Sequence, residues 1–178
     1  MDLREKKTLR HIQNAFLRLR ANKPLERITV KELSEQAEIS KATFYLHYKD
    51  IYDLSEQLQD EVVQKVLDSL THPELFLTNQ KQFTQELFHA FYSYQSLTEI
   101  LFSGNQAAVL PLRIEQGLKE HIFQIVPEAR EDARFNILLS YHIQGGYYAY
   151  MENHKHFSNE NILDALDEIS SKLPLQPT

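Results

Sequence analysis

The chain has 178 residues, with 19 Lys and Arg, 25 Asp and Glu, and no Cys, for a formal net charge of −6. Without cysteine it can form neither disulfides nor thiolate metal sites, and no apolar run approaches the length that spans a membrane. We therefore expect a cytoplasmic protein with no membrane partner, and its four Gly and six Pro are few enough to favour helices throughout.

The first predicted helix covers about residues 4–22, because apolar side chains recur on one face at helical spacing. These side chains are Leu9, Ile12, Phe16 and Leu19. Four basic residues occupy its first turns, where they could lie along a phosphate backbone, namely Arg4, Lys6, Lys7 and Arg10. Pro24 ends this segment, since proline resists continuing a helix.

Two short helices joined by a tight turn are predicted over residues 29–48. The Thr29 hydroxyl can cap the first while Glu32 reaches back to it, and Ser40 can cap the second. In the second helix Phe44 and Tyr48 face inward, and Lys41, Thr43, Tyr45 and His47 face outward. This pattern is typical of a helix-turn-helix whose second helix enters the major groove of DNA.

The distribution of charge agrees with a nucleic-acid partner. Residues 1–50 hold 11 Lys and Arg against 7 Asp and Glu, whereas the rest of the chain holds 8 against 18. A surface that binds nucleic acid needs local positive charge to displace counterions from phosphates, even where the whole chain is acidic. Short capped helices with basic surfaces also occur in helical proteins that bind no DNA, so the motif leaves that alternative open.

Six further helices are predicted, giving nine in all. They cover about residues 50–70, 80–94, 97–102, 106–126, 128–154 and the segment from Ser158 onwards. Asp50 caps the first of these. At about twenty residues that helix spans about 30 Å, enough to link a helix-turn-helix domain at 1–50 to a helical domain at 51–178.

The second domain contains a cluster of aromatic residues with a few polar ones among them. Such a mixture suits either a pocket for a drug-sized ligand or a core that the rings simply fill. The candidate effector-binding residues are Phe88, Phe91, Tyr92, Phe102, Gln106, Arg113, Tyr141 and His142. The pattern by itself does not choose between the two interpretations.

Residues 37–49, Ala-Glu-Ile-Ser-Lys-Ala-Thr-Phe-Tyr-Leu-His-Tyr-Lys, resemble the tetracycline-repressor (TetR) family of bacterial transcriptional regulators. The strong resemblance covers about residues 8–58, and beyond residue 60 only length and helical layout match. It implies an all-helical homodimer that binds a palindromic, double-stranded operator. It further implies that an unknown small-molecule effector entering the C-terminal domain releases the operator, or in some members tightens the binding.

The resemblance also implies roles for individual residues. The second motif helix would enter the major groove, while hydroxyl and lysine side chains hold phosphates. The candidate DNA-binding residues are Thr29, Ser40, Lys41, Ala42, Thr43, Tyr45, Leu46, His47 and Lys49. The expected function is a ligand-responsive repressor that is not an enzyme and uses no cofactor.

Two adjacent glycines, Gly145 and Gly146, lie inside a predicted helix, where each costs about 1 kcal/mol relative to Ala. Close helix packing is one reason for them, and a functional kink is another. In the resembling family the last two helices form the dimer interface. The candidate dimer residues here are Gly145, Gly146, Tyr147, Tyr150, Leu163, Leu166 and Ile169.

Three positions depart from the family pattern. Glu38 stands where the family usually has Gly, so we expect a different turn or some strain. Ala42 stands where Gly or Pro is common, which still allows close approach to DNA. Ile51 stands where many members have a Lys that contacts phosphate, and Lys49 is placed to serve instead.

Other functions have less support. The eight His residues are scattered and show no ligand spacing such as HExxH, so no metal site is assigned, although a metal-responsive regulator of the same fold remains an alternative. A helical protein-interaction module without DNA binding is the second alternative. No phosphate-binding glycine loop or nucleophile motif indicates an enzyme.

Overall fold

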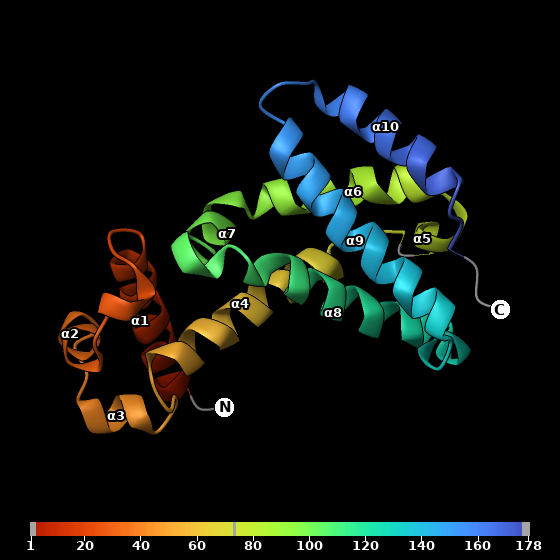
Figure 1. Cartoon of the computed structure of the whole chain (residues 1–178). Coiled ribbons are helices and arrows are strands. Elements are labelled where there is room, and N and C mark those ends of the chain that lie inside the picture. Colours follow the sequence, from red (N-terminus) through yellow and green to blue (C-terminus); the bar gives the residue numbers. More distant parts are fainter. Residues whose placement is uncertain (1–2, 73, 176–178) are drawn as a thin grey trace. The chain divides into compact units, whose positions relative to one another are not determined.

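The structure is a computed structural model that describes residues 3–72 and 74–175. Those residues form ten α-helices and three short 3-10 helices, with no strand among them (Figure 1). The all-α prediction is confirmed. The additional helix is α5 (Leu75–Thr78), a single four-residue turn that the sequence pattern did not reveal. None of the described helices is both long and apolar enough to cross a bilayer.

The contacts divide the chain into two compact units, of which the first comprises residues 1–62 and 95–107. Its elements are α1 (Leu3–Arg20), η1 (Leu25–Arg27), α2 (Val30–Gln36), α3 (Lys41–Tyr45), the start of α4 (Ile51–Asp68), α7 (Gln95–Leu101) and η2 (Gly104–Gln106). Helix α1 packs against α2 and α7, and α2 packs against α3. The fully buried apolar core of this unit is Ile12, Ala15, Phe16, Leu33, Phe44 and Leu54.

The first unit extends beyond the boundary expected at residue 50, because buried polar contacts tie residues 101–106 to α1 and α4. The Gln59 amide nitrogen donates to the Leu101 carbonyl oxygen and to Gln106 Oε1, each at 3.1 Å. The Arg20 guanidinium donates to the Ser103 carbonyl oxygen at 2.7 Å. Hydrogen bonds made away from water cost more to break than exposed ones, so these contacts hold the segment firmly.

The second unit comprises residues 63–94 and 108–178. Its elements are the end of α4, α5, α6 (Gln80–Ser93), α8 (Val109–Ile125), η3 (Pro127–Arg130), α9 (Ala133–Asn153) and α10 (Asn159–Ser171). Helix α9 packs against α8 and α10, and α10 packs against α6. The buried side chains that these helices share include Phe83, Ile114, Leu118, Phe135, Leu139 and Ile162.

A glycine lies where α8 packs closely on the end of α4. A Cβ atom at Gly117 of α8 would collide with Cδ1 of Leu67 near the end of α4. Leu67 is itself 2% exposed, so its side chain has little room to move away. A side chain at position 117 would therefore force the buried Leu67 side chain to shift.

Candidate nucleic-acid interface

Helix α2 begins at the cap that the sequence predicts. Thr29 has an extended backbone, and its side-chain oxygen accepts a hydrogen bond from the Glu32 N–H at 3.3 Å. The Glu32 carboxylate pairs with the Lys23 ammonium, where the sequence predicted a bond back to the cap residue. The N-cap is confirmed, and an ion pair replaces the second half of the predicted capping box.

The turn between α2 and α3 depends on Glu38, which lies in the left-handed region at φ 57°. Its N–H donates to the Glu35 carbonyl oxygen at 3.3 Å. The next N–H, from Ile39, donates to the Ser34 carbonyl oxygen at 3.0 Å. These two bonds form a Schellman motif, which ends a helix in one tight turn. A side chain in left-handed backbone costs about 1–2 kcal/mol, so Glu38 keeps the geometry of a glycine turn at the cost of local strain.

Helix α3 begins at its predicted cap, Ser40. The Ser40 hydroxyl accepts a hydrogen bond from the Thr43 N–H at 3.0 Å and lies 2.8 Å from the Thr43 hydroxyl. When Thr43 donates in that second pair, the Ser40 proton is left for an external acceptor such as a phosphate oxygen. The cap fixes the direction of a helix of only five residues.

The two faces of α3 and the turn after it differ in burial, as predicted. Phe44 is fully buried and Tyr48 is 5% exposed, with ring centroids 5.7 Å apart. Burial raises the pKa of the Tyr48 hydroxyl, against an opposing hydrogen bond from Gln13 of α1. Outside, Tyr45 exposes 57% of its surface and Leu46 exposes 81%. One apolar face therefore anchors α3 while the opposite face is presented to solvent.

The remaining candidate DNA-binding residues divide by exposure. Thr29, Ser40, Lys41, Ala42 and Lys49 are exposed, whereas Thr43 and His47 are half-buried. Because the Thr43 hydroxyl is engaged with Ser40 and His47 is partly covered, the exposed row has few hydrogen-bond donors for bases. Lys41 is the exposed charged donor on the helix itself.

The first turn of α4 holds the backbone beside this row. Asp50 Oδ1 accepts a hydrogen bond from the Asp53 N–H at 2.8 Å, and Asp53 Oδ2 accepts one from the Lys49 N–H at 2.8 Å. The Lys49 N–H, followed by the Gln57 side chain, lowers the pKa of the Asp53 carboxyl. The Lys49 backbone is thus fixed while its ammonium stays exposed to solvent.

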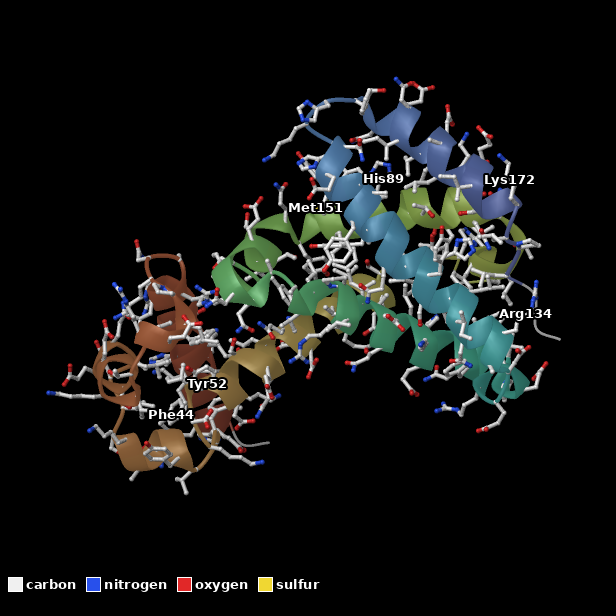
Figure 2. The ribbon with its side chains drawn as sticks, in the orientation of Figure 1. Phe44, Tyr52, His89, Arg134, Met151 and Lys172 are labelled. Carbon is white, nitrogen blue, oxygen red and sulfur yellow. The ribbon has the colours of Figure 1, made fainter. Side chains whose placement is uncertain are left out.

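Ile51 and Tyr52 complete the start of α4. Ile51 is 5% exposed, so at the position where the resembling family often has a phosphate-binding Lys this chain has a core residue. Tyr52, labelled in Figure 2, is 50% exposed and is a further candidate contact that the sequence pattern did not indicate. A phenol three residues after Lys49 could donate to a phosphate, but helical spacing alone does not reveal that it is exposed.

Several exposed basic side chains lie on the two motif helices, on the turn that follows them and on α1. The exposed ones on α1, α2, α3 and the following turn are Arg4, Lys6, Lys7, Arg10, Arg18, Lys31, Lys41 and Lys49. Such charges contribute little to folding at the surface, but they attract phosphates. The local excess of positive charge that the sequence predicts is therefore accessible to a polyanion.

A polar hollow of about 230 Å³ lies in the first unit between α1 and the end of α2. His11, Asn14 and Arg18 line it from α1, and Gln36, Ala37 and Glu38 line it from the other side. It contains none of the aromatic residues expected to bind an effector. Across residues 3–72 and 74–175, no group of three His, Cys, Asp or Glu side chains is arranged to hold a metal ion.

The candidate effector-binding residues fall into both units. Phe102 and Gln106 belong to the first, where Phe102 is buried and Gln106 accepts the bond from Gln59. The other six belong to the second, namely Phe88, Phe91, Tyr92, Arg113, Tyr141 and His142. The sequence could not separate these two groups, because residues 95–107 join the first unit only through long-range contacts.

Within the second unit, four of those six residues differ in exposure and in contacts. Tyr92 is 76% exposed and Tyr141 is 56% exposed, so both face solvent. His142 Nε2 lies 2.8 Å from the Leu173 carbonyl oxygen, which connects α9 to the segment after α10. Phe88 instead packs on Tyr150, with ring centroids 4.2 Å apart.

The candidate dimer residues also differ from one another. A Cβ atom at Gly145 or Gly146 would meet nothing within 4 Å, so neither glycine serves packing inside this chain. Tyr150 is occupied, because its ring packs on Phe88 and its hydroxyl donates to Asn159 Oδ1 at 3.2 Å. Tyr147, Leu163 and Leu166 are half-buried, and Ile169 is 49% exposed.

An exposed apolar stripe runs along α9 beside Gly145. Its large side chains are Ile137 at 69%, Tyr141 at 56% and Tyr148 at 48% exposure. With Gly145 they recur at intervals of four, four and three residues, which places them on one helical face. The sequence does not single out this stripe, because the opposite face, with Phe135 and Leu139 fully buried, is also apolar.

These observations define a helix-turn-helix: two capped helices joined by a tight turn, packed with α1, and presenting one outward row from the second helix. No family model matches the chain. Over 77 residues it is 29% identical to a protein of Bacillus subtilis (strain 168) described as an uncharacterized HTH-type transcriptional regulator, YxbF. The match covers 41% of this chain and 20% of that protein. The chain is thus similar to a helix-turn-helix regulator over less than half its length.

Proposed function

We propose that this chain is a DNA-binding transcription regulator of the tetracycline-repressor type, acting as a repressor on a palindromic operator. The observation that carries the proposal is the division of α3 and its C-cap residue, in which Phe44 is fully buried while Tyr45 and the C-cap Leu46 are exposed. The resemblance of residues 37–49 to that family supports the same class. So does the similarity to a helix-turn-helix regulator.

In this proposal α3 lies in the major groove, and contacts to phosphates set its position. The phosphate contacts come from Thr29, Ser40, Tyr45 and Lys49, and the groove contacts from Lys41, Ala42, Thr43, Leu46 and His47. Lys41 is exposed and charged, so it is the side chain best placed to donate to guanine O6 or N7. The exposed Tyr52 adds a phosphate contact at the start of α4.

Selection of duplexes from a random DNA library tests the proposal. The wild-type chain should enrich a palindromic sequence, and Lys41→Ala should weaken binding to it by about 1–3 kcal/mol and relax one base position. Lys155→Ala is the matched control, because Lys155 is an exposed lysine in the second unit. A wild-type chain that enriches no duplex at low salt would contradict the proposal and favour a helical protein-interaction module.

We propose further that the chain is a homodimer joined through the stripe on α9. Three large exposed apolar side chains in one row on a helix mark an interaction surface, and the open side of Gly145 lets a second helix approach closely. An interface between identical chains can bury the same stripe from both partners. The residues proposed are Ile137, Tyr141, Gly145, Gly146 and Tyr148 on α9, with the exposed Ile169 of α10.

Sedimentation of charge-introducing variants tests the dimer. Tyr148→Glu should yield monomers, because an unpaired carboxylate would be buried at the interface. Leu112→Glu is the control, since Leu112 on α8 is similarly exposed, at 54%, but lies outside the stripe. A dimer that withstands Tyr148→Glu as well as it withstands Leu112→Glu would place the interface elsewhere.

We also propose that a small molecule controls DNA binding through the second unit. The support is a half-buried aromatic group, in which Phe88 packs on Tyr150 and Tyr150 stacks on His154 with centroids 5.5 Å apart. Rings with polar edges suit a drug-sized ligand. Operator release against a metabolite panel tests this, and Phe88→Ala should weaken the response. Release by divalent metals alone would instead support the metal-responsive alternative.

A further inference from the structure

Two apolar side chains share the outward face of the helix that we propose to enter DNA. The Leu46 N–H donates to the Ala42 carbonyl oxygen at 3.2 Å, so the two residues stand one helical turn apart. Ala42 is exposed, and Leu46 exposes 81% of its surface. Neither side chain can form a hydrogen bond with a base edge.

Folding of the chain does not explain this exposed leucine. Phe44 and Tyr48, on either side of it, supply the buried face of the helix, and Leu46 extends away from them. Single exposed apolar residues are common on protein surfaces. Leu46, however, shares one helical face with Ala42 and the 57% exposed Tyr45, and the exposed Lys41 and Lys49 flank these residues in the sequence. An apolar patch with lysines at both ends of its segment suits a polyanion that also offers apolar groups.

The thymine C5-methyl group is the apolar group that the major groove offers. We infer that Ala42 and Leu46 read thymine methyl groups in each half-site, and this inference rests on the proposed function. The four-residue step from Ala42 to Leu46 advances about 6 Å along the helix axis, and base pairs are stacked about 3.4 Å apart. The two residues therefore contact thymines about two base pairs apart, on the same or opposite strands.

Replacement of thymine by uracil tests this reading, because uracil keeps the pairing and removes the methyl group alone. Each thymine of the duplex selected by the wild-type chain is replaced singly, and Kd is measured by fluorescence anisotropy at fixed salt. Uracil at the contacted positions should weaken binding about three- to tenfold, as expected for the loss of one buried methyl contact. Uracil outside the half-sites should leave Kd unchanged.

A double-mutant cycle, which combines each protein variant with each uracil substitution, shows which side chain contacts which methyl group. Leu46→Ala should weaken binding to the thymine duplex and should remove most of the penalty for uracil at one position. Leu112→Ala, an exposed leucine of the second unit, should keep the full uracil penalty. Because Leu46 is so exposed, its loss should leave the thermal midpoint of unfolding unchanged, which excludes misfolding as the cause.

The outcomes separate this inference from the proposed function. A selected duplex that binds equally well with uracil at every half-site position overturns the reading of methyl groups and leaves the regulator intact. If uracil weakens binding as much for Leu46→Ala and for Ala42→Gly as for the wild-type chain, the inference is also overturned, because a change in DNA flexibility would then explain the loss of affinity. Failure to enrich any duplex overturns the proposed function and this inference together.

Discussion

The outward faces of α3 and α9 both carry exposed apolar side chains, yet their surroundings differ. On α3 the exposed Tyr45 and Leu46 lie between Lys41 and Lys49. On α9 the stripe of Ile137, Tyr141, Gly145 and Tyr148 contains no charged residue. A basic apolar face suits DNA, whereas a neutral one suits another protein surface. Two faces of similar hydrophobicity therefore lead us to propose different partners, and charge decides between them.

The largest expected effect is a difference in stability between substitutions on the two sides of α3. Phe44→Ala should destabilise the first unit by about 3–5 kcal/mol, because a fully buried ring is replaced by a cavity. Leu46→Ala should change the free energy of unfolding by less than about 0.5 kcal/mol. Denaturation in urea measures both values. A comparable loss of unfolding free energy in the two variants would mean that Leu46 packs against the protein and is not presented to a partner.

The next comparison concerns two glycines within helices of the second unit. Gly117→Ala should destabilise the protein by about 1–3 kcal/mol, because the new methyl group overlaps the buried Leu67 side chain. Gly145→Ala meets nothing within 4 Å and should stabilise the isolated chain by up to about 1 kcal/mol, because Ala favours helix. Thermal unfolding at protein concentrations that keep the chain monomeric measures both. An equal loss of stability in Gly117→Ala and Gly145→Ala would show that Gly145 is packed within its own chain.

A third prediction concerns the polar contact that holds α9 against α8. Glu115 accepts hydrogen bonds from Lys119 at 2.7 Å and from Gln144 at 2.9 Å, and it also pairs with the Ser140 hydroxyl. Burial acts to raise the pKa of the Glu115 carboxyl, but these hydrogen bonds outweigh it and lower the pKa below the ordinary 4.5.

Because the folded-state pKa of Glu115 is depressed, its contribution to stability is present above about pH 4.5 and is lost as the pH falls through the folded value. Glu115→Gln should therefore cost about 1–2 kcal/mol at pH 7 and less as the pH falls below 4.5. Urea denaturation at several pH values provides the measurement. A cost that is independent of pH would assign the effect to packing.

The smallest effect tests the turn that presents α3. Glu38→Gly should stabilise the first unit by about 0.5–1 kcal/mol, because glycine relieves the strain at φ 57° but loses more backbone entropy on folding. DNA affinity should stay the same, since the turn geometry is already that of a glycine turn. Glu35→Gly, at an exposed position inside α2, is the control and should destabilise. A destabilised Glu38→Gly variant would contradict the strain assigned to this residue.

The sequence predicted best those features that depend on neighbours along the chain. The caps at Thr29 and Ser40 and the inward faces of Phe44 and Tyr48 follow from spacings of three or four residues, and hydrogen bonds and burial confirm them. At Glu38, where the resembling family usually has Gly, we expected a different turn or some strain, and the left-handed backbone at φ 57° corresponds to the second of these. These features depend on residues within one or two helical turns of each other, so they can be predicted from one sequence.

The features that it did not predict depend on residues far apart. The bond from Gln59 to Leu101 crosses 42 positions, and no local pattern assigns residues 95–107 to the first unit. On α9 both faces are apolar, so the sequence could not show which face packs on α8 and which leaves Tyr141 exposed. The importance of Gly117 likewise appears only once Leu67 is placed beside it.

The most direct test of the central claim, that the outward face of α3 binds DNA, is the salt dependence of affinity. Log Kd against log salt is measured for the wild-type chain, Lys49→Ala and the control Lys155→Ala on the selected duplex. We predict that Lys49→Ala weakens binding to every duplex and makes the slope shallower by about 0.9, the value for one lost phosphate contact. Lys155→Ala should keep the wild-type slope. If Lys49→Ala binds with the same affinity and the same salt slope as the wild-type chain, the assignment of this face to DNA is contradicted.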